Sequence, residues 1–367
     1  MGNLTIQDVA TILDQMAPVA YAEDFDNVGL LVGNAANTLT GILVCHDALP
    51  EVVAEAAAKN CNLIVCFHPI VFSGLKKITG KSYVERAVML TLRHDIAIYA
   101  VHTSLDNHIR GVNRIFCDAL GLQNPKILIP KKQFIRKLIT YTVPENADKV
   151  REALFRNGAG NIGNYDHCSF NSEGTGTYRG NECSEPVIGN KGELTHTHEV
   201  RIEVTFEKHH QAQLLRALFD AHLYEEVAYE VYELENEHQH IGLGMIAELD
   251  APMDEHAFLK MVRDKMRCGG IRHSAFTGKP VRKVAVLGGS GASAIGNAIR
   301  AGADAFLTSD LKYHNYFEAE GKILLADIGH YESERYTKNY IVEFLREKIA
   351  NFAIVLSETN TNPVKYL

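Results

Sequence analysis

Several features that mark particular classes of protein are missing from this sequence of 367 residues. It contains no run of 18 apolar residues, and a helix needs about that many to cross a bilayer, so we expect no membrane-spanning segment. It also has no basic excess, because 45 acidic side chains outnumber 37 basic ones and the net charge is −8. Nucleic acid is therefore an unlikely class of partner, since phosphate contacts require lysine and arginine.

Secretion signals and paired cysteines are missing as well. Residues 1–18 contain acidic side chains and a helical spacing of apolar residues, where a signal peptide would have a basic region followed by an apolar one. The cysteine count is odd, at 7, and no two are spaced C-x-x-C. This pattern argues against a disulfide framework or a cysteine-based zinc site and predicts reduced thiols in a cytoplasmic protein.

What the sequence does contain is typical of a globular protein with more than one domain. Hydrophobic residues make up 46% and charged residues 22% of the chain, and the length predicts two or three domains. Histidine is unusually frequent, at 17 residues, so we expect some of these side chains to act as metal ligands or as acid–base groups.

The first and last thirds of the chain alternate short apolar strands with helices, which predicts α/β domains with mostly parallel sheets. A long amphipathic helix is expected over residues 333–349. The predicted strands are Gly41–Cys45, Leu63–Phe67, Ile96–Val101, Val284–Leu287, Ala305–Leu307 and Ile323–Ala326.

The middle third follows another pattern, close to strand–helix–strand repeated twice, which is typical of a ferredoxin-like α+β domain. A glycine-rich polar stretch over residues 158–192 follows the first predicted helix of this third, and we assign no strand to it. We therefore predict an inserted domain over residues 132–236 within a discontinuous core formed by residues 1–131 and 237–367.

Metal-ligating side chains follow three of the predicted strands. His68 follows one strand, His102 and Asp106 follow the next, and His330 and Glu334 follow a third. Ligand sites in open α/β sheets lie at such strand ends, and residues four apart share one face of a helix. We interpret the group as a centre for divalent ions that activate water. Taken alone, Asp106 equally fits a helix cap and Glu334 a solvated acid in a first helical turn.

A second group of residues is open to several interpretations. The run Gly288-Gly289-Ser290-Gly291 follows a strand, and with Ala294 it fits G-x-G-x-x-A, with Asp310 about 20 residues further on. A dinucleotide site, a phosphate site and a simple tight turn all agree with this pattern. His314 fits an acid–base or supporting role, and equally a surface position.

These residues together resemble the Nif-three-like dinuclear metal proteins, often named GTP cyclohydrolase 1 type 2, over nearly the whole chain. The insert is similar to PII and CutA proteins in residues 158–165 and 222–229. The segments that carry the main resemblance are residues 23–33, 67–72, 102–107, 288–291, 308–314 and 329–335.

The resemblance implies a two-part Nif-three-like α/β core with a PII/CutA-like insert, assembled as a homohexamer. It implies one or two divalent ions per chain, zinc first and iron or manganese as alternatives. It assigns the metal ligands as His68, Asp106, His330 and Glu334, and leaves His102 and His314 as supporting or proton-shuttling residues.

One residue departs from the family pattern. The family usually has His-His-Pro where this chain has Phe67-His68-Pro69, and a phenyl ring cannot ligate a metal. One ion should then bind more weakly, or use His46, His102, His314 or water as a replacement ligand.

Two functional hypotheses follow from these residues. The first is a metal-dependent hydrolase that acts on a nucleotide-like small molecule, with GTP as the candidate substrate. The second is a non-catalytic metal-binding hexamer with a regulatory or scaffold role, in which the insert senses a small ligand. A dinucleotide-dependent oxidoreductase is the weakest alternative, because no hydride-transfer residues accompany the glycine turn.

Overall fold

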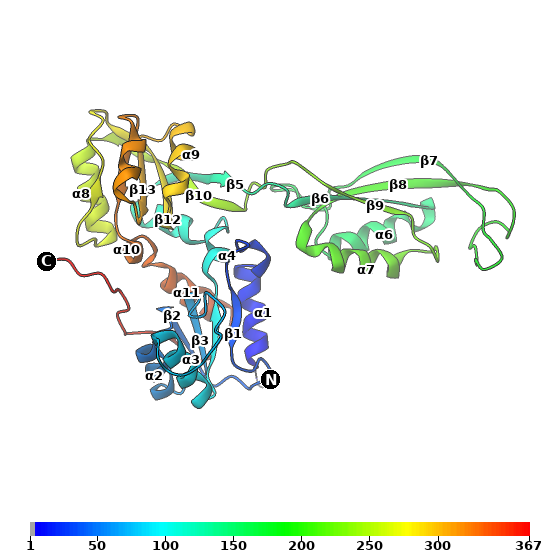
Figure 1. The fold of residues 1–367 in the computed structure, drawn as a ribbon. Coiled ribbons are helices and arrows are strands. Elements are labelled where there is room, and N and C mark those ends of the chain that lie inside the picture. Colours follow the sequence, from blue (N-terminus) through cyan, green and yellow to red (C-terminus); the bar gives the residue numbers. More distant parts are fainter. Residues whose placement is uncertain (1–3) are drawn as a thin grey trace. The chain divides into compact units, whose positions relative to one another are not determined.

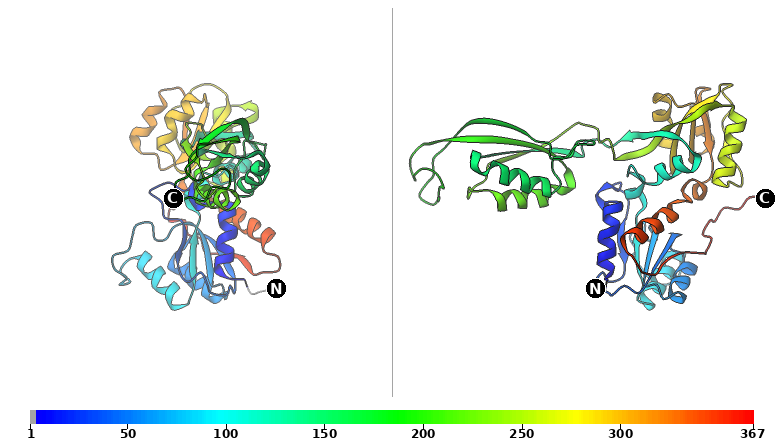
Figure 2. Two further views of the ribbon diagram at one scale, coloured as in Figure 1. Left: turned by 90° about the vertical axis from the view of Figure 1, so that its right-hand side faces the viewer. Right: turned by 180° about the vertical axis from the view of Figure 1, so that it is seen from behind.

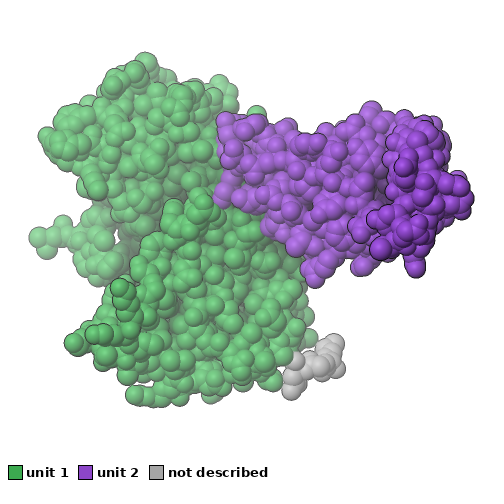
Figure 3. Space-filling model, turned by 45° about the vertical axis from the view of Figure 1, so that its right-hand side comes forward, with its two compact units in different colours: residues 1–129, 240–367 green, residues 130–239 purple. Residues whose placement is uncertain are grey.

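The computed structural model describes residues 4–367 and divides into two compact units (Figures 1 and 3). The core unit consists of the chain up to Ile129 and from His240 onward, and the insert unit consists of Pro130–Gln239. Residues 1–3 of the amino-terminal segment considered for a signal peptide lie outside the described residues. No helix among the described residues is long and apolar enough to cross a membrane.

The first sheet of the core unit has the strand order β1-β4-β3-β2-β15. Strands β15, β2, β3 and β4 run parallel, and β1 pairs antiparallel with β4. Helices α1 and α11 bury one face of this sheet, and α2 and α3 bury the other. The bounds are β1 Gly29–Val32, β2 Ile42–Asp47, β3 Leu63–His68, β4 Ala97–Ala100, β15 Ile354–Leu356, α1 Ile6–Met16, α2 Pro50–Ala58, α3 Tyr83–Arg93 and α11 Thr337–Lys348.

The second sheet of the core unit has the order β11-β14-β13-β12-β10-β5. Its centre, β12, β13 and β14, is parallel, with α5 and α8 packed on one face and α9 on the other. The bounds are β5 Gln123–Pro130, β10 Gly242–Met253, β11 Arg272–His273, β12 Val281–Ser290, β13 Ala305–Ser309, β14 Leu324–Asp327, α5 Val112–Leu120, α8 Glu255–Met266 and α9 Ile295–Arg300.

The insert unit is a four-stranded antiparallel sheet in the order β7-β8-β6-β9, with both helices on one face (Figures 1 and 2). The chain order β6-α6-β7-β8-α7-β9 in this arrangement is the ferredoxin-like topology. The bounds are β6 Ile135–Thr142, α6 Pro144–Arg156, β7 Phe170–Tyr178, β8 Thr195–Glu207, α7 Gln211–Ala221 and β9 Tyr229–Glu233.

Two segments differ from their predicted form. The glycine-rich stretch contains β7, which pairs with β8 from Phe170 to Tyr178, so the backbone ladder sustains a strand that its side chains do not indicate. The single helix expected over residues 333–349 is two helices, α10 (His330–Glu334) and α11, separated at Arg335 and Tyr336. Both intervening side chains donate to backbone oxygens near the end of α8, which holds the chain at this break.

The segment after β15 is fastened to α2 by one carboxylate. Glu55 accepts hydrogen bonds from Ser357 Oγ at 2.6 Å, from the Glu358 amide at 2.9 Å and from Thr359 Oγ1 at 2.8 Å. Burial favours a higher pKa, but hydrogen bonds from Lys59, Ser357 and the tail outweigh it and lower the pKa of Glu55 to about 2. The ionised form therefore stabilises the folded protein.

We expect Glu55→Gln to lower the free energy of unfolding by about 1–3 kcal/mol at neutral pH, after allowance for solvent screening. Because the folded pKa lies below the ordinary value of 4.5, this contribution is complete above pH 4.5. It disappears as the pH falls toward 2. Urea titrations at several pH values measure it, with exposed Glu51→Gln in the same helix as the control. A difference that persists at the lowest pH would contradict the assignment.

Candidate metal centre

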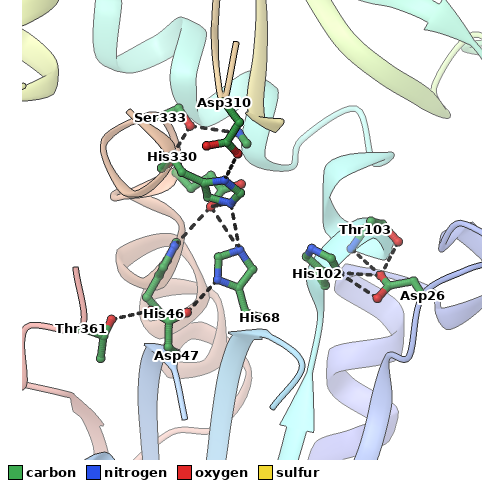
Figure 4. Close-up of polar contacts among 12 residues, drawn as sticks. Asp26, His46, Asp47, His68, His102, Thr103, Asp310, His330, Ser333 and Thr361 are labelled. Atoms are coloured by element: carbon green, nitrogen blue, oxygen red, sulfur yellow. Dashed lines mark hydrogen bonds and ion pairs between the residues drawn. The ribbon is translucent and has the colours of Figure 1, made fainter. Parts of the chain in front are cut away.

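The candidate centre lies where the carboxyl ends of the first sheet's strands meet α10 of the second half of the core unit (Figure 4). His46 and Asp47 end β2, and His68 ends β3, its neighbour in the sheet. Parallel strands present their carboxyl ends at one edge, so these side chains come together for topological reasons. His330 and Glu334 begin and end the short helix α10.

Glu334 is the point on which three imidazoles converge. Its Oε2 atom lies 3.2 Å from His46 Nε2, 3.4 Å from His68 Nε2 and 3.4 Å from His330 Nε2. The Nε2 atoms of His68 and His330 are 3.3 Å apart. In a tetrahedral site with bonds of about 2.0–2.1 Å, neighbouring ligand atoms are about 3.3–3.4 Å apart. The observed spacing therefore suits a divalent ion.

The hydrogen bonding at this point is incomplete. The Oε2 atom of Glu334 is buried and makes no hydrogen bond of good geometry with any residue that the structure describes. Buried polar atoms are normally paired, since an unpaired one costs about 1–3 kcal/mol. A cation bound by Glu334, His68 and His330 would satisfy these atoms, and the three residues form one of the groups able to hold an ion.

Carboxylates orient three of the histidine rings. His68 Nδ1 lies 2.8 Å from Asp47 Oδ1, and His330 Nδ1 lies 2.6 Å from Asp310 Oδ2. His102 Nδ1 lies 2.8 Å from Asp26 in the same way. A carboxylate on Nδ1 leaves Nε2 as the free nitrogen and makes it a better ligand, which is the usual arrangement around metal-binding histidines.

Neither Asp26 nor Asp47 was identified from the sequence as a site residue, and Asp310 was considered only as the acid of a possible dinucleotide-binding pattern. A signal for two of them was present. Asp47 ends the strand beside His68, and Asp310 follows the strand beside His330. Asp26 lies in a loop far from His102 in sequence, and only the fold brings them together.

Asp106 is the last residue of α4 (His102–Asp106), and its Oδ1 atom is buried without a hydrogen-bond partner among the described residues. Burial and the nearby Glu334 carboxylate raise its pKa well above the ordinary value. It does not cap the next helix, since Gly111 occupies the N-cap position of α5, and the capping interpretation is therefore wrong. A buried carboxyl group without a partner is the kind of group that a bound cation would stabilise.

The charges of Glu334 and His68 are coupled. Burial opposes ionisation of Glu334, but the neighbouring imidazoles of His46 and His68 lower its pKa far below the ordinary value. Burial likewise opposes the imidazolium form of His68, but the hydrogen bond to Asp47 and the nearby Glu334 carboxylate raise its pKa to about 10. A proton on His68 thus balances the carboxylates, and a divalent ion would displace that proton.

The two proposed supporting histidines lie in different environments. His102 packs edge-on against His68, with 5.4 Å between ring centroids. His314 is exposed on η4 (Tyr313–Ala319), where its ring packs against Tyr313 and Phe317. Among the described residues, His314 belongs to none of the groups that could hold a metal ion.

The glycine run at the end of β12 lines the candidate centre. The Gly288 amide donates to Asn113 Oδ1 and the Gly289 amide donates to Ser333 Oγ, both at 2.9 Å. A Cβ atom on Gly289 would lie 2.5 Å from Glu334 Oε1. These amides are already used, so of the three interpretations the structure favours a tight turn that lets backbone approach α10.

The Asp310–His330 contact predicts a measurable effect on metal affinity. We expect Asp310→Asn to weaken metal binding by about 10–100-fold, because the neutral amide polarises and orients the His330 ring less well. Competition against a coloured chelator measures the change, with exposed Asp250→Asn as the control. Equal affinities for Asp310→Asn and the unmodified protein would show that Asp310 does not support a metal ligand.

Comparisons with known proteins agree with this fold. A model of the Duf34/NIF3 (NGG1p interacting factor 3) family matches residues 4–363, and the chain belongs to that family. It is 37% identical to a GTP cyclohydrolase 1 type 2 homolog of Bacillus subtilis and 34% identical to one of Halalkalibacterium halodurans, each over 98% of both chains.

Solved structures show the same relationship. A Bacillus cereus protein related to NIF3 superimposes with a TM-score of 0.85 at 34% identity, covering 100% of both chains. The Staphylococcus aureus protein SA1388 superimposes with a TM-score of 0.80 at 29% identity, also over 100% of both chains. The two-part α/β core expected from the sequence is therefore confirmed.

Proposed function

We propose that this protein is a divalent-metal-dependent hydrolase acting on a nucleotide-like small molecule. The observation that supports it best is the convergence of His68, His330 and Glu334 within 3.3–3.4 Å of one another. Zinc is the first candidate, because imidazole nitrogen and carboxylate oxygen are its usual ligands in catalytic sites; iron and manganese are the alternatives. GTP is the candidate substrate, since relatives carry the name GTP cyclohydrolase 1 type 2 homolog.

In this proposal His68, His330, Glu334 and Asp106 hold one or two ions. A bound divalent ion lowers the pKa of water toward neutrality and so supplies a nucleophile. His102 faces the same edge of the sheet, and the Asp26 carboxylate at its Nδ1 keeps Nε2 available to carry a proton. The reaction would be hydrolysis at an electron-poor carbon such as C8 of guanine, in which water adds to C8 and cleavage of its two C–N bonds releases this carbon as formate.

A second function has a specific observation in its favour. The insert unit contains a cavity of about 610 Å³, lined among others by Tyr141, Glu199, Arg201 and Tyr224, which is within the size range of small-molecule sites. A non-catalytic metal-binding regulator or scaffold, assembled as a homohexamer and sensing a ligand in this cavity, would use both features. The hexamer is part of both proposals, and light scattering on the purified protein tests it.

One experiment separates the two functions. The metal-loaded protein is incubated with GTP, and products are followed by mass spectrometry, with Glu334→Gln as the inactive control. Metal-dependent release of formate supports the hydrolase. Tight binding of a small molecule without turnover, abolished by substitutions in the insert cavity, supports the regulator instead.

A further inference from the structure

His46 is a buried histidine at the centre that the metal assignment above does not use. It is 3% exposed and lies on β2 directly beside Phe67 of β3, because the parallel register pairs Cys45 with Cys66 and Asp47 with His68. Residues in register on neighbouring parallel strands point to the same face of the sheet. The two rings accordingly stack, with centroids 5.4 Å apart.

The nitrogens of His46 are not satisfied by the protein. Neither Nδ1 nor Nε2 makes a hydrogen bond of good geometry with any residue described by the structure. Yet Nε2 lies 3.2 Å from Glu334 Oε2, an atom that also makes none. Two buried atoms at this distance without a hydrogen bond have the spacing of two ligands on one ion, about 3.3 Å for bonds of 2.0–2.1 Å.

We propose that His46 is a metal ligand of this centre and supplies the imidazole that Phe67 cannot supply. The proposal rests on the proposed function for the presence of a metal, and it adds the residue that completes the ligand set. Moving a histidine from position 67 to position 46 displaces the side chain by one strand spacing, about 4.8 Å, on the same face of the sheet. Glu334 remains within reach of the displaced ring.

The surroundings of Phe67 agree with this exchange. Phe67 is fully buried and belongs to the core beneath the first sheet, with Val65 and Val101. Its ring lies edge-on to His102, with centroids 5.6 Å apart. Phe67 therefore belongs to the apolar packing beside the candidate centre, while the Nε2 atom of His46 lies next to Glu334. For this reason Phe67→His alone should add little metal affinity and should destabilise the core.

The test compares His46→Leu with the unmodified protein and with His222→Leu. His222 is also a buried histidine, but its Nε2 is hydrogen-bonded to the Tyr141 carbonyl oxygen in the insert unit. Zinc content and chelator competition give stoichiometry and affinity, and absorption of the cobalt-loaded protein reports the number of nitrogen ligands. We expect His46→Leu to weaken one ion by about 100-fold or more and to change the cobalt spectrum, and His222→Leu to do neither.

Two further measurements distinguish a ligand from a residue that only holds Glu334 by a hydrogen bond. Metal-free His46→Leu should melt at or above the metal-free unmodified protein, because an unsatisfied buried group is removed. A hydrogen-bonding role would lower its melting temperature. Adding Phe67→His to His46→Leu should recover affinity to within tenfold of the unmodified protein. His46→Gln, close in size, replaces the leucine variant if that one does not fold.

Unchanged stoichiometry and affinity in His46→Leu or His46→Gln would overturn the proposal, and so would a lower metal-free melting temperature with metal binding intact. Failure of the double variant to recover metal would show that positions 46 and 67 do not exchange roles. A different result identifies failure of the proposed function: the unmodified protein itself then holds no ion after loading, whatever residue 46 is.

Discussion

Glu334→Gln is expected to abolish metal binding almost completely, with a loss of affinity greater than about 100-fold. Loss of a residue that only supports a ligand typically costs about 10–100-fold, and Glu334 is proposed to be a ligand itself. Glu334 Oε2 lies within 3.2–3.4 Å of the Nε2 atoms of His46, His68 and His330. Glutamine keeps the size of the side chain but removes the charge, and a neutral amide is a poor ligand. Metal content after dialysis against a loaded chelator measures the loss.

A matched control lies two residues away. Glu332 is on the same helix, is similarly buried and accepts a hydrogen bond from Asn362 Nδ2 at 3.0 Å. Glu332→Gln should retain metal, because that carboxylate faces the carboxyl-terminal segment. Equal metal content in Glu334→Gln and Glu332→Gln would remove Glu334 from the ligand set, and circular dichroism confirms that both variants are folded.

Gly289→Ala is expected to damage both stability and metal binding. The backbone of Gly289 has a φ of +70°, and an added Cβ would lie 2.5 Å from Glu334 Oε1. The left-handed backbone costs about 1–2 kcal/mol for a residue with a side chain. Relief of the collision moves Glu334 away from the imidazoles. We expect a loss of about 1–3 kcal/mol in unfolding free energy and at least about tenfold in metal affinity.

Gly296→Ala is the control for this substitution. Gly296 lies in α9, where an added Cβ meets only the flexible end of Arg300 at 3.2 Å. Alanine favours a helix by about 0.5–1 kcal/mol over glycine, so this variant should be as stable as the unmodified protein or more so. Chemical denaturation and chelator competition on both variants decide the matter. Normal metal affinity in a destabilised Gly289→Ala protein would show that the backbone at Gly289 does not position Glu334 for metal binding.

Much of the core followed from the sequence because its cues are local. Buried parallel strands are short continuous apolar runs, and Leu63–Phe67 and Ala305–Leu307 are visible as such. Parallel strands have their carboxyl ends at one edge of a sheet. A histidine that follows one such strand is therefore expected to lie near polar residues that follow the neighbouring strand. His68, His330 and Glu334 were selected on this ground, and the structure brings them within 3.4 Å.

Other features left no local cue. Strand β7 runs through Gly174 and Gly176, and its ladder with β8 forms through backbone hydrogen bonds that side-chain patterns do not reveal. The break between α10 and α11 depends on contacts of Arg335 and Tyr336 with the distant end of α8. Helical periodicity alone predicts one continuous helix through that point.

The sequence by itself determined the two-part α/β core, the ferredoxin-like pattern of the insert and three of the residues that meet at the centre. Hydrophobic periodicity and strand ends can be recognised from residues that are neighbours in the sequence. Only the tertiary structure decided which atoms face each other. It brings Asp26 into contact with His102, 76 residues away in sequence, and Asp310 into contact with His330, 20 residues away. It also places His46 beside Phe67, with the His46 Nε2 atom near Glu334. Such pairings depend on strand order and register, which are set by packing between segments far apart in the chain.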